Sequence, residues 1–433
     1  MNKKYLIKCG TVIDPANKIN AVLDLLISNG KIEKAGKDLD VKADETIDAK
    51  GMIVAPGFID MHTHLREPGR EDEETVRTGT RAAIHGGFTS VLCMPNTDPA
   101  LDNAAMVKAL KEIIEKDALC NVFIAGAITE KRVGKILNDF EKLKKEGVIA
   151  ITDDGSPVQN EEVMRKALAK SKAAGLILIE HCEDTVLSSR GIMNEGFIST
   201  KIGLKGISTR SEYEAVKRDL ELAKKESSRI HIAHVSCKES VELIRRAKKA
   251  GLHVTAETAP HYFSLTDDCC VSYDTNTKMN PPLRAKEDVE AIKQGLADGT
   301  IDAIATDHAP HTDSEKDVEF DNAPFGIIGL ETALSLGVAE LVDKKILSWD
   351  ALIAKLTCNP AGILGLKRGS LKEGAVADIT IIDPAKEYIF KKDSIESKSK
   401  NSPFLDWKLK GKVISVFVSG RLMMINETIV GDV

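Results

Sequence analysis

The chain lacks the features that mark several common classes of protein. No apolar segment is long enough to span a membrane, and the apolar run after Lys3 and Lys4 is too short for a signal peptide. Lysine and arginine form no cluster or stripe that would indicate nucleic-acid binding. The eight cysteines are scattered without a Cys-x-x-Cys pair, which favours a reducing, cytoplasmic setting. We therefore expect a cytoplasmic protein with no membrane partner and no nucleic-acid partner.

The glycine pair Gly86-Gly87 does not form a phosphate-binding loop. It lacks the Lys-Ser/Thr ending that such a loop requires, so we interpret it as a turn. The chain has 433 residues and a formal net charge of −6, with the two signs interspersed. That length leaves room for one large domain and one small domain. The composition agrees with a soluble enzyme.

Histidines are few, and two of them stand close together in an apolar run. Only ten histidines occur in the chain. Because side chains alternate along a strand, His62 and His64 should point the same way, and two imidazoles on one face can bind one divalent ion. Arg66 continues the same phase, which would place a guanidinium beside the metal. Pro68 and Gly69 should end the strand. A lone His-x-His pair is a weak signal, so the rest of the chain decides its meaning.

Other polar groups stand at the ends of further apolar runs. His181, His234 and Asp307 each end one run, and the pair Asp153-Asp154 ends another. Such runs are typical of parallel strands that are buried on both faces. The candidate strands lie near residues 57–64, 89–95, 121–128, 147–153, 176–181, 230–235, 252–258 and 301–307. A barrel of parallel strands holds its catalytic groups at the C-terminal ends of the strands, which is where these residues stand.

Helical patterns alternate with most of these strands. They cover residues 103–116, 132–146, 160–174, 211–227, 236–250 and 285–298. The long spacings between the fifth and sixth strands, and between the seventh and eighth, predict extra loops at the C-terminal face. The sequence therefore predicts an α/β fold in which residues 55–366 form a (β/α)8 TIM-type barrel.

Both ends of the chain contain short strand patterns outside the barrel. Residues 1–54 and 367–433 are each too small to bury a core of their own. We therefore expect them to fold together into one small β-sandwich domain beside the barrel. The polar and charged stretch 384–412 is predicted to consist of loops that are partly mobile.

Together these motifs resemble the bacterial type I dihydroorotases, in the cyclic amidohydrolase branch of the amidohydrolase superfamily. The resemblance begins with His-Thr-His-Leu-Arg-Glu-Pro-Gly at residues 62–69. It continues in the family's order at residues 94–97, 152–155, 180–181, 233–236, 278–284, 305–311, 324–326 and 359–361. Most of these motifs are weak alone, but together they are specific, and they cover essentially the full length.

The resemblance implies a centre with two metal ions. The implied ligands are His62, His64, Asp154, His181, His234 and Asp307. Many relatives bridge the metals with a carboxylated lysine, which type I enzymes replace by an aspartate. Motif alignment favours Asp154 for this place, and Asp153 is the alternative. Two Zn²⁺ ions per subunit are expected, although Mn²⁺ or Co²⁺ would also suit the ligands.

The resemblance also implies a reaction and a substrate site. N-carbamoyl-L-aspartate would be cyclised reversibly to L-dihydroorotate with loss of water, in pyrimidine biosynthesis, and Asp307 would carry the proton. Arg66 can form two parallel hydrogen bonds to the substrate carboxylate. The implied substrate-binding residues are His64, Arg66, Asn96, Asn280, His311, Phe325 and Gly326.

Two alternative functions remain open. An allantoinase or hydantoinase uses the same barrel and metal site, but Arg66, Asn96 and the bridging aspartate argue against it. A non-catalytic dihydroorotase-like scaffold for aspartate transcarbamoylase should have lost metal ligands, and all six are present. We expect a homo-oligomer, and an active chain could also form a complex with aspartate transcarbamoylase.

The other histidines are given mostly structural interpretations. We interpret His85, His231 and His253 as surface, packing or core residues. His308 should lie behind the site, since it follows Asp307 and points to the other face. His261 is left open between a structural role and a place next to the site.

Overall fold

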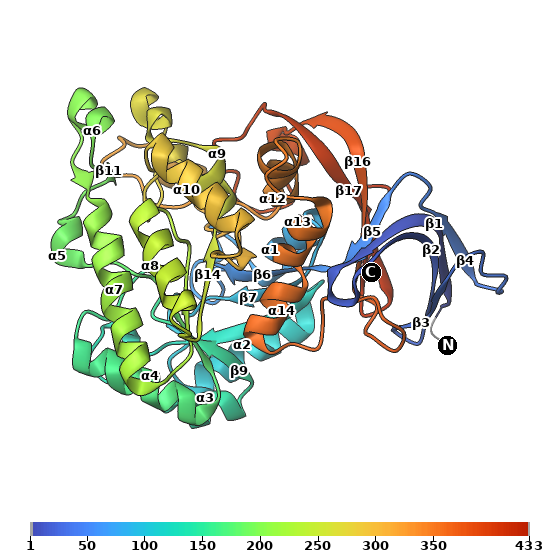
Figure 1. Ribbon diagram of the computed structural model, residues 1–433, viewed down its shortest axis with the longest axis horizontal. Helices are drawn as coiled ribbons and strands as arrows, with labels where there is room; N and C mark the ends of the chain where they lie inside the picture. The colour runs from blue at the N-terminus through green and yellow to red at the C-terminus, as the bar shows by residue number, and fades with distance from the viewer. Residues whose placement is uncertain (1–2, 432–433) are drawn as a thin grey trace.

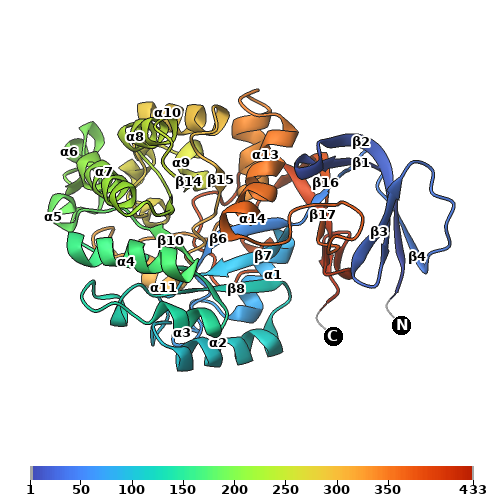
Figure 2. The same cartoon turned by 60° about the horizontal axis from the view of Figure 1, so that its bottom comes forward.

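The computed structural model describes residues 3–431 and contains an eight-stranded parallel sheet surrounded by helices (Figures 1 and 2). Its strands are β6 (Phe58–Thr63), β7 (Phe88–Cys93), β8 (Asn121–Gly126), β9 (Val148–Ile151), β10 (Ile177–Glu180), β13 (Ile230–Ile232), β14 (Val254–Thr258) and β15 (Ala303–Ile304). They neighbour one another in chain order, and each falls within or next to a predicted strand. All eight predicted strands are confirmed, because apolar runs of this length are stable only where both faces are covered.

The first and last strands of this sheet meet, so the barrel is nearly closed. Thr63, at the end of β6, forms a parallel bridge with His308, just after β15. The amide of His64 donates a hydrogen bond of 2.9 Å to the carbonyl of His308. This closure brings the segments around residues 62–66 and 307–311 side by side at the C-terminal end of the barrel.

Five of the six predicted helices are confirmed. They are α2 (Ala104–Asp117), α4 (Glu161–Ala174), α7 (Thr209–Glu226), α8 (Lys238–Lys249) and α10 (Lys286–Ala297). Local chemistry sets their ends. The side chain of Asn160 caps α4 by accepting hydrogen bonds from two amides, and Gly175 ends it at a φ of 68°. Within residues 3–431, no helix combines the length and apolar character needed to cross a bilayer.

The helix predicted over residues 132–146 is wrong in its first half. Only α3 (Phe140–Lys145) is helical there, and the side chain of Asp139 caps its start. Within the predicted range, Arg132 and Gly134 have φ values of 55° and 69°, in the left-handed region. A right-handed helix cannot pass through such residues, so a tight turn replaces its first part.

The remaining helices are shorter and complete the shell and the loops around the barrel. α1 (Val76–His85), α13 (Trp349–Leu356) and α14 (Cys358–Leu364) belong to the shell. Short elements fill the long connections: α5 (Thr185–Ser188), β11 (Met193–Asn194), α6 (Phe197–Ile202), β12 (Gly206–Ile207), α9 (Pro260–Ser264), α11 (Asp313–Lys316) and α12 (Ala333–Gly337). The predicted long excursions after the fifth and seventh strands are therefore present.

Both ends of the chain form a second sheet of nine strands beside the barrel (Figure 1). They are β1 (Tyr5–Asp14), β2 (Ile19–Ser28), β3 (Lys31–Gly36), β4 (Glu45–Asp48), β5 (Ile53–Pro56), β16 (Ile379–Ile389), β17 (Lys408–Val418), β18 (Arg421–Ile425) and β19 (Thr428–Ile429). β5 and β16 pair antiparallel, which joins the two ends. A shared buried cluster, including Ile7 from one end and Phe417 from the other, explains the pairing. The first two and last two residues of the predicted ranges lie outside the described residues.

The prediction for residues 384–412 is wrong in part. β16 continues to Ile389 and β17 begins at Lys408, so the two ends of this polar stretch are strand. The connection between them is also not a solvated loop. Ser397, Ser399 and Asn401 are buried there, because they form hydrogen bonds with the barrel.

Candidate metal centre and substrate pocket

Six buried side chains converge at the C-terminal end of the barrel. His62 and His64 stand at and just after the end of β6, and the others directly follow later strands. These others are Asp154 after β9, His181 after β10, His234 after β13 and Asp307 after β15. Because the strands are parallel, their C-terminal ends meet at one rim, and side chains far apart in sequence face one another there.

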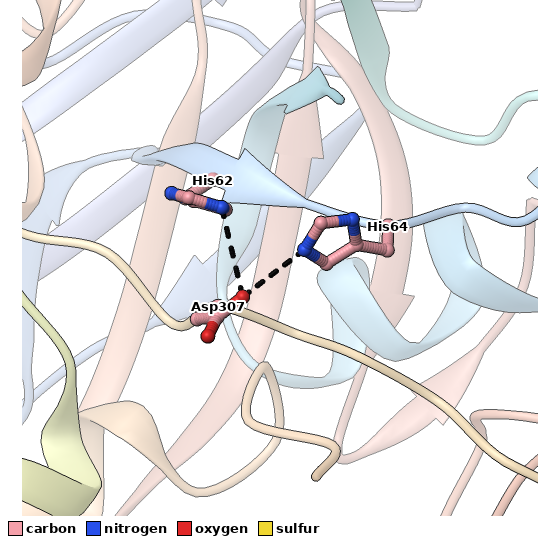
Figure 3. Close-up of side chains that lie close together, drawn as sticks. All are labelled: His62, His64 and Asp307. Atoms are coloured by element: carbon pink, nitrogen blue, oxygen red, sulfur yellow. Dashed lines mark hydrogen bonds and ion pairs between the residues drawn. The ribbon is translucent and has the colours of Figure 1, made fainter. Parts of the chain in front are cut away.

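One half of this cluster joins the first and last strands (Figure 3). Oδ1 of Asp307 lies 3.1 Å from Nε2 of His64 and 3.6 Å from Nε2 of His62. Asp307 has a φ of 50° and His234 a φ of 34°, both in the left-handed region. Non-glycine residues adopt such conformations at a cost, and functional sites are where that cost is commonly found.

The other half is a pair of imidazoles joined to the first half by Asp154. Nδ1 of His181 and Nε2 of His234 are 2.9 Å apart. Oδ1 of Asp154 lies 3.8 Å and 3.5 Å from these two nitrogens. The same oxygen is 3.3 Å from Nε2 of His62, and Oδ2 is 3.6 Å from Nε2 of His64. The carboxylate of Asp154 therefore stands between two pairs of imidazoles.

The neighbouring Asp153 points away from this cluster. Its carboxylate accepts hydrogen bonds from the amide and the hydroxyl of Thr129. Burial raises the pKa of Asp153 to about 6, although these hydrogen bonds oppose the shift. Of the two aspartates left open by the sequence, the geometry brings Asp154 to the imidazoles.

The donor set fits a divalent metal. Ligand atoms of His62, His64 and Asp307 lie within 4.8 Å of one another, and so do those of His62, Asp154 and His234. Nε2 of His62 and Oδ1 of Asp154 are buried without a hydrogen-bond partner, although they face each other. Burial opposes ionisation of Asp154, but the neighbouring imidazoles hold the pKa of its carboxyl well below its usual range. Ionised carboxylate and imidazole ligands are those that zinc and related cations take.

Two carboxylates that hold these imidazoles escaped the sequence analysis. Nδ1 of His62 lies 2.9 Å from Glu257, which also faces His231 at 3.3 Å. Nε2 of His181 lies 3.0 Å from Glu183. Carboxylates of this kind fix the tautomer and orientation of metal-binding histidines. Glu257 could have been found, because it stands at the end of a barrel strand, whereas Glu183 lies in a loop without any pattern.

A cavity of about 210 Å³ opens beside the cluster. Its lining contains all seven predicted substrate-binding residues, His64, Arg66, Asn96, Asn280, His311, Phe325 and Gly326. Asn96 accepts a hydrogen bond from Nδ1 of His64 over 2.8 Å if that nitrogen carries the proton, which leaves Nε2 of the same ring facing the carboxylates. Asn280 donates to Glu183 over 2.9 Å, so the carboxylate behind His181 also holds a residue of the cavity.

Arg66 lines the cavity although it lies outside the strand, so strand alternation does not explain its position. β6 ends at Thr63, and Arg66 has a φ of 62°, so the predicted continuation of the strand phase is wrong. The guanidinium is held by Glu73, whose Oε2 lies 2.9 Å from Nε. Oε1 of Glu73 lies 2.8 Å from Nδ1 of His311, and Nη2 of Arg66 is 3.3 Å from Nε2 of the same ring. Burial lowers the pKa of His311, so the charge of this pair lies on Arg66, and one buried carboxylate holds both side chains.

The remaining histidines serve mostly in packing. His85 is buried and pairs with Glu331 at 2.5 Å, and His308 lies between Glu74 and a backbone amide. Neither lines the cavity, so both interpretations agree with the structure. His253 is exposed. His261 is buried next to β14, and burial lowers the pKa of its imidazole to about 4, so it is neutral at physiological pH.

Comparisons with known proteins show the family of the chain. A model of the amidohydrolase family matches residues 53–423. The chain is 54% identical to a dihydroorotase of Elusimicrobium minutum over 426 residues, which cover 98% of this chain and 99% of the relative. It is 52% identical to a dihydroorotase of Geobacter metallireducens over 419 residues, with coverage of 96% and 99%. The solved structure of an L-hydantoinase (dihydropyrimidinase) from Arthrobacter aurescens has a TM-score of 0.89 at 23% identity, with coverage of 99% and 98%. At that identity the structural likeness shows the fold alone.

Proposed function

The chain belongs to the amidohydrolase family, and we propose that it is a dihydroorotase, which interconverts N-carbamoyl-L-aspartate and L-dihydroorotate plus water. One observation carries this proposal. A buried guanidinium, Arg66, lines the same small cavity as the cluster of histidines and aspartates. A cyclic amide that also carries a carboxylate can meet both groups at once. Uncharged cyclic amides, such as simple hydantoins, have no carboxylate that could pair with the guanidinium.

We propose that the six side chains of the cluster hold two divalent cations, of which Zn²⁺ is the first candidate. His62 and His64 would hold one ion, His181 and His234 the other, and Asp154 would bridge them. When bound, the cations supply an activated water at neutral pH and polarise the amide oxygen. The chain itself contributes the orientation of the imidazoles, through Glu257 and Asn96.

Asp307 is the group of this site that can carry the proton. Its carboxylate is ionised, since the imidazoles around it hold its pKa below the usual range although burial acts in the opposite direction. In hydrolysis, Oδ1 or Oδ2 accepts a proton from the attacking water and returns it to the ring nitrogen as that nitrogen leaves. In cyclisation, the same carboxylate takes the proton from the carbamoyl nitrogen and returns it to the departing water.

The remaining cavity residues hold the substrate. Arg66, Asn96 and His311 would bind the carboxylate outside the reacting amide, and Asn280 and the backbone at Phe325 and Gly326 would hold the ring. We call Arg66, Asn96 and His311 the carboxylate clamp. Because Glu73 already holds both Arg66 and His311, this clamp is oriented before substrate arrives. Preorganisation of this kind reduces the cost of binding.

A substrate panel tests the function. We expect the purified protein, supplied with Zn²⁺, to interconvert N-carbamoyl-L-aspartate and L-dihydroorotate, and to act poorly on hydantoin and allantoin. Metal analysis of the same preparation should give two ions per subunit. Preference for hydantoin or allantoin would replace the proposal by the alternative cyclic amidohydrolase. A preparation that binds no metal and acts on none of the four compounds would favour the non-catalytic scaffold for aspartate transcarbamoylase.

Glu257→Gln is expected to weaken Zn²⁺ binding by about 10- to 100-fold, since the glutamine cannot hold the protonated Nδ1 of His62 as firmly. Competition with a chromogenic chelator measures this affinity without reference to activity. Glu331→Gln is the matched control, because it alters another buried carboxylate–imidazole pair, that with His85. Equal affinities in the two variants would show that Glu257 does not support the centre.

Other features of the biology are proposed from the sequence. We propose that the protein is cytoplasmic and forms a homo-oligomer, and that complex formation with aspartate transcarbamoylase be tested by co-purification. We also propose the domain boundaries given above, with the barrel over residues 55–366 and the small domain over residues 1–54 and 367–433.

A further inference from the structure

Residues 396–402 form a partly buried segment between β16 and β17 that reaches the wall of the cavity. The segment alternates charged residues with short polar ones, and the short ones are buried: Ser397 is fully buried and Asn401 is only 3% exposed. Buried polar groups are stable only when they are hydrogen-bonded. The partners of this segment are therefore informative, and they belong to the loops that carry the candidate substrate-binding residues.

Asn401 joins two of these loops. Its Oδ1 accepts a hydrogen bond of 3.1 Å from the amide of His311. Its Nδ2 donates to the carbonyls of Ala309 at 3.2 Å and Gly326 at 3.1 Å. The amide group thus uses both of its donors and its acceptor on the backbone of two loops that line the cavity. None of these partners belongs to the six-residue cluster.

The two loops touch closely at the point that Asn401 spans. Gly326 has a φ of 120°, and a Cβ placed there would lie 2.6 Å from Cβ of Ala309. Only glycine allows this approach. The loops are also joined directly, because the amide of Ala309 donates a hydrogen bond of 2.8 Å to the carbonyl of Ile327, and Nε2 of His311 lies 2.8 Å from the carbonyl of Phe325. Asn401 adds a third link, which is the one that holds the carbonyls of Ala309 and Gly326 and the amide of His311 at a fixed spacing.

The same segment also binds the backbone of Glu73, the residue that holds the carboxylate clamp. The hydroxyl of Ser399 donates a hydrogen bond of 2.6 Å to the carbonyl of Glu73. Glu73 in turn holds Arg66 and His311 through its carboxylate. Residues 396–402 therefore bind the backbone of both Glu73 and His311, whose side chains contact the guanidinium of Arg66.

We propose that Asn401 is a positioning residue for substrate recognition, which sets the spacing of the loops at residues 309–311 and 325–326 so that the clamp fits the substrate carboxylate. The inference rests on the proposed function. Asn401 touches backbone atoms of the clamp and acts through His311 and Gly326. Its effect is on substrate binding, and it has no hydrogen bond to the metal centre.

The test compares Asn401→Ala with Asn138→Ala in the zinc-loaded enzyme. Asn138 is the matched control, because it is another buried asparagine that donates to a backbone carbonyl, that of Ala127, and it does not line the cavity. We expect Asn401→Ala to raise KM for L-dihydroorotate roughly 10-fold or more, since small displacements of a bound substrate have large effects. We expect kcat to change much less, and Zn²⁺ affinity, measured by chelator competition, to stay at the wild-type value. Asn138→Ala should lower the melting temperature without raising KM.

Two further variants protect the test against a failure to fold. Asn401→Asp keeps the size and the acceptor for the amide of His311 but loses both donors, and Asn401→Ser shortens the side chain while keeping it polar. A folded variant of Asn401 with the same KM as Asn138→Ala would overturn the proposal. A loss of Zn²⁺ affinity in parallel with the rise in KM would also overturn it, because that pattern means that the substitution disturbs the whole site and not the substrate-binding loops alone. A wild-type protein inactive on L-dihydroorotate would instead refute the proposed function.

Discussion

Asp307→Asn is expected to lower turnover of L-dihydroorotate by roughly 10²–10⁴-fold, the usual contribution of general acid–base catalysis. Asparagine keeps the shape of the side chain but cannot accept a proton from water. The position of Asp307 supports the large effect, because its Oδ1 lies 3.1 Å from His64 and the side chain lines the cavity. Steady-state kcat of the fully metallated variant is the measurement.

Metal content must be measured in the same preparation, since Asp307 is also a proposed ligand. Asp302→Asn is a matched control at the opposite end of the last strand, where Asp302 pairs with Lys248 at 2.6 Å. It should retain near-normal turnover. If Asp307→Asn binds two ions and turns over at a similar rate to the control, Asp307 does not carry the proton.

The barrel could be predicted from the sequence because its strands are short apolar runs that end in polar residues. Each run, such as Val148–Ile151 before Asp154, is buried on both faces, because helices cover the outside of the barrel and side chains of the other strands fill its inside. Apolar composition therefore marks the position of each strand. The start of the segment 132–146 could not be predicted in the same way. Its helical pattern is real, but the left-handed backbone of Arg132 and Gly134 overrides it.

The imidazoles and carboxylates of the site were found by motif, whereas the residues that hold them were not. The alternate spacing of His62 and His64 indicates that they share one face of a strand. Glu73 and Glu183 lie in loops, where no sequence pattern distinguishes a carboxylate of the site from a solvated one. Asn401 is further removed, because it belongs to a polar stretch that composition assigns to solvent. Its role depends on hydrogen bonds across 75 and 90 residues of sequence, to Gly326 and His311, and no local pattern encodes such contacts.

Arg66→Met should lower activity on L-dihydroorotate by roughly 10²-fold or more, as expected for loss of a buried charged contact. Methionine removes the charge and keeps much of the bulk. Activity on an uncharged cyclic amide, where it is measurable, should fall far less, because its transition state does not use the guanidinium. The two values of kcat/KM therefore separate recognition of the carboxylate from general damage.

Arg70→Met is the control that the structure offers. Arg70 pairs with the same carboxylate, Glu73, at 3.2 Å, but it does not line the cavity. Removing it changes the charge balance of Glu73 while Arg66 still faces the substrate, so kcat/KM for L-dihydroorotate should change little. Equal losses on the charged and uncharged substrates in Arg66→Met would mean that Arg66 supports the loops or the metal centre through Glu73 and His311. The guanidinium would then no longer identify the substrate as a carboxylate.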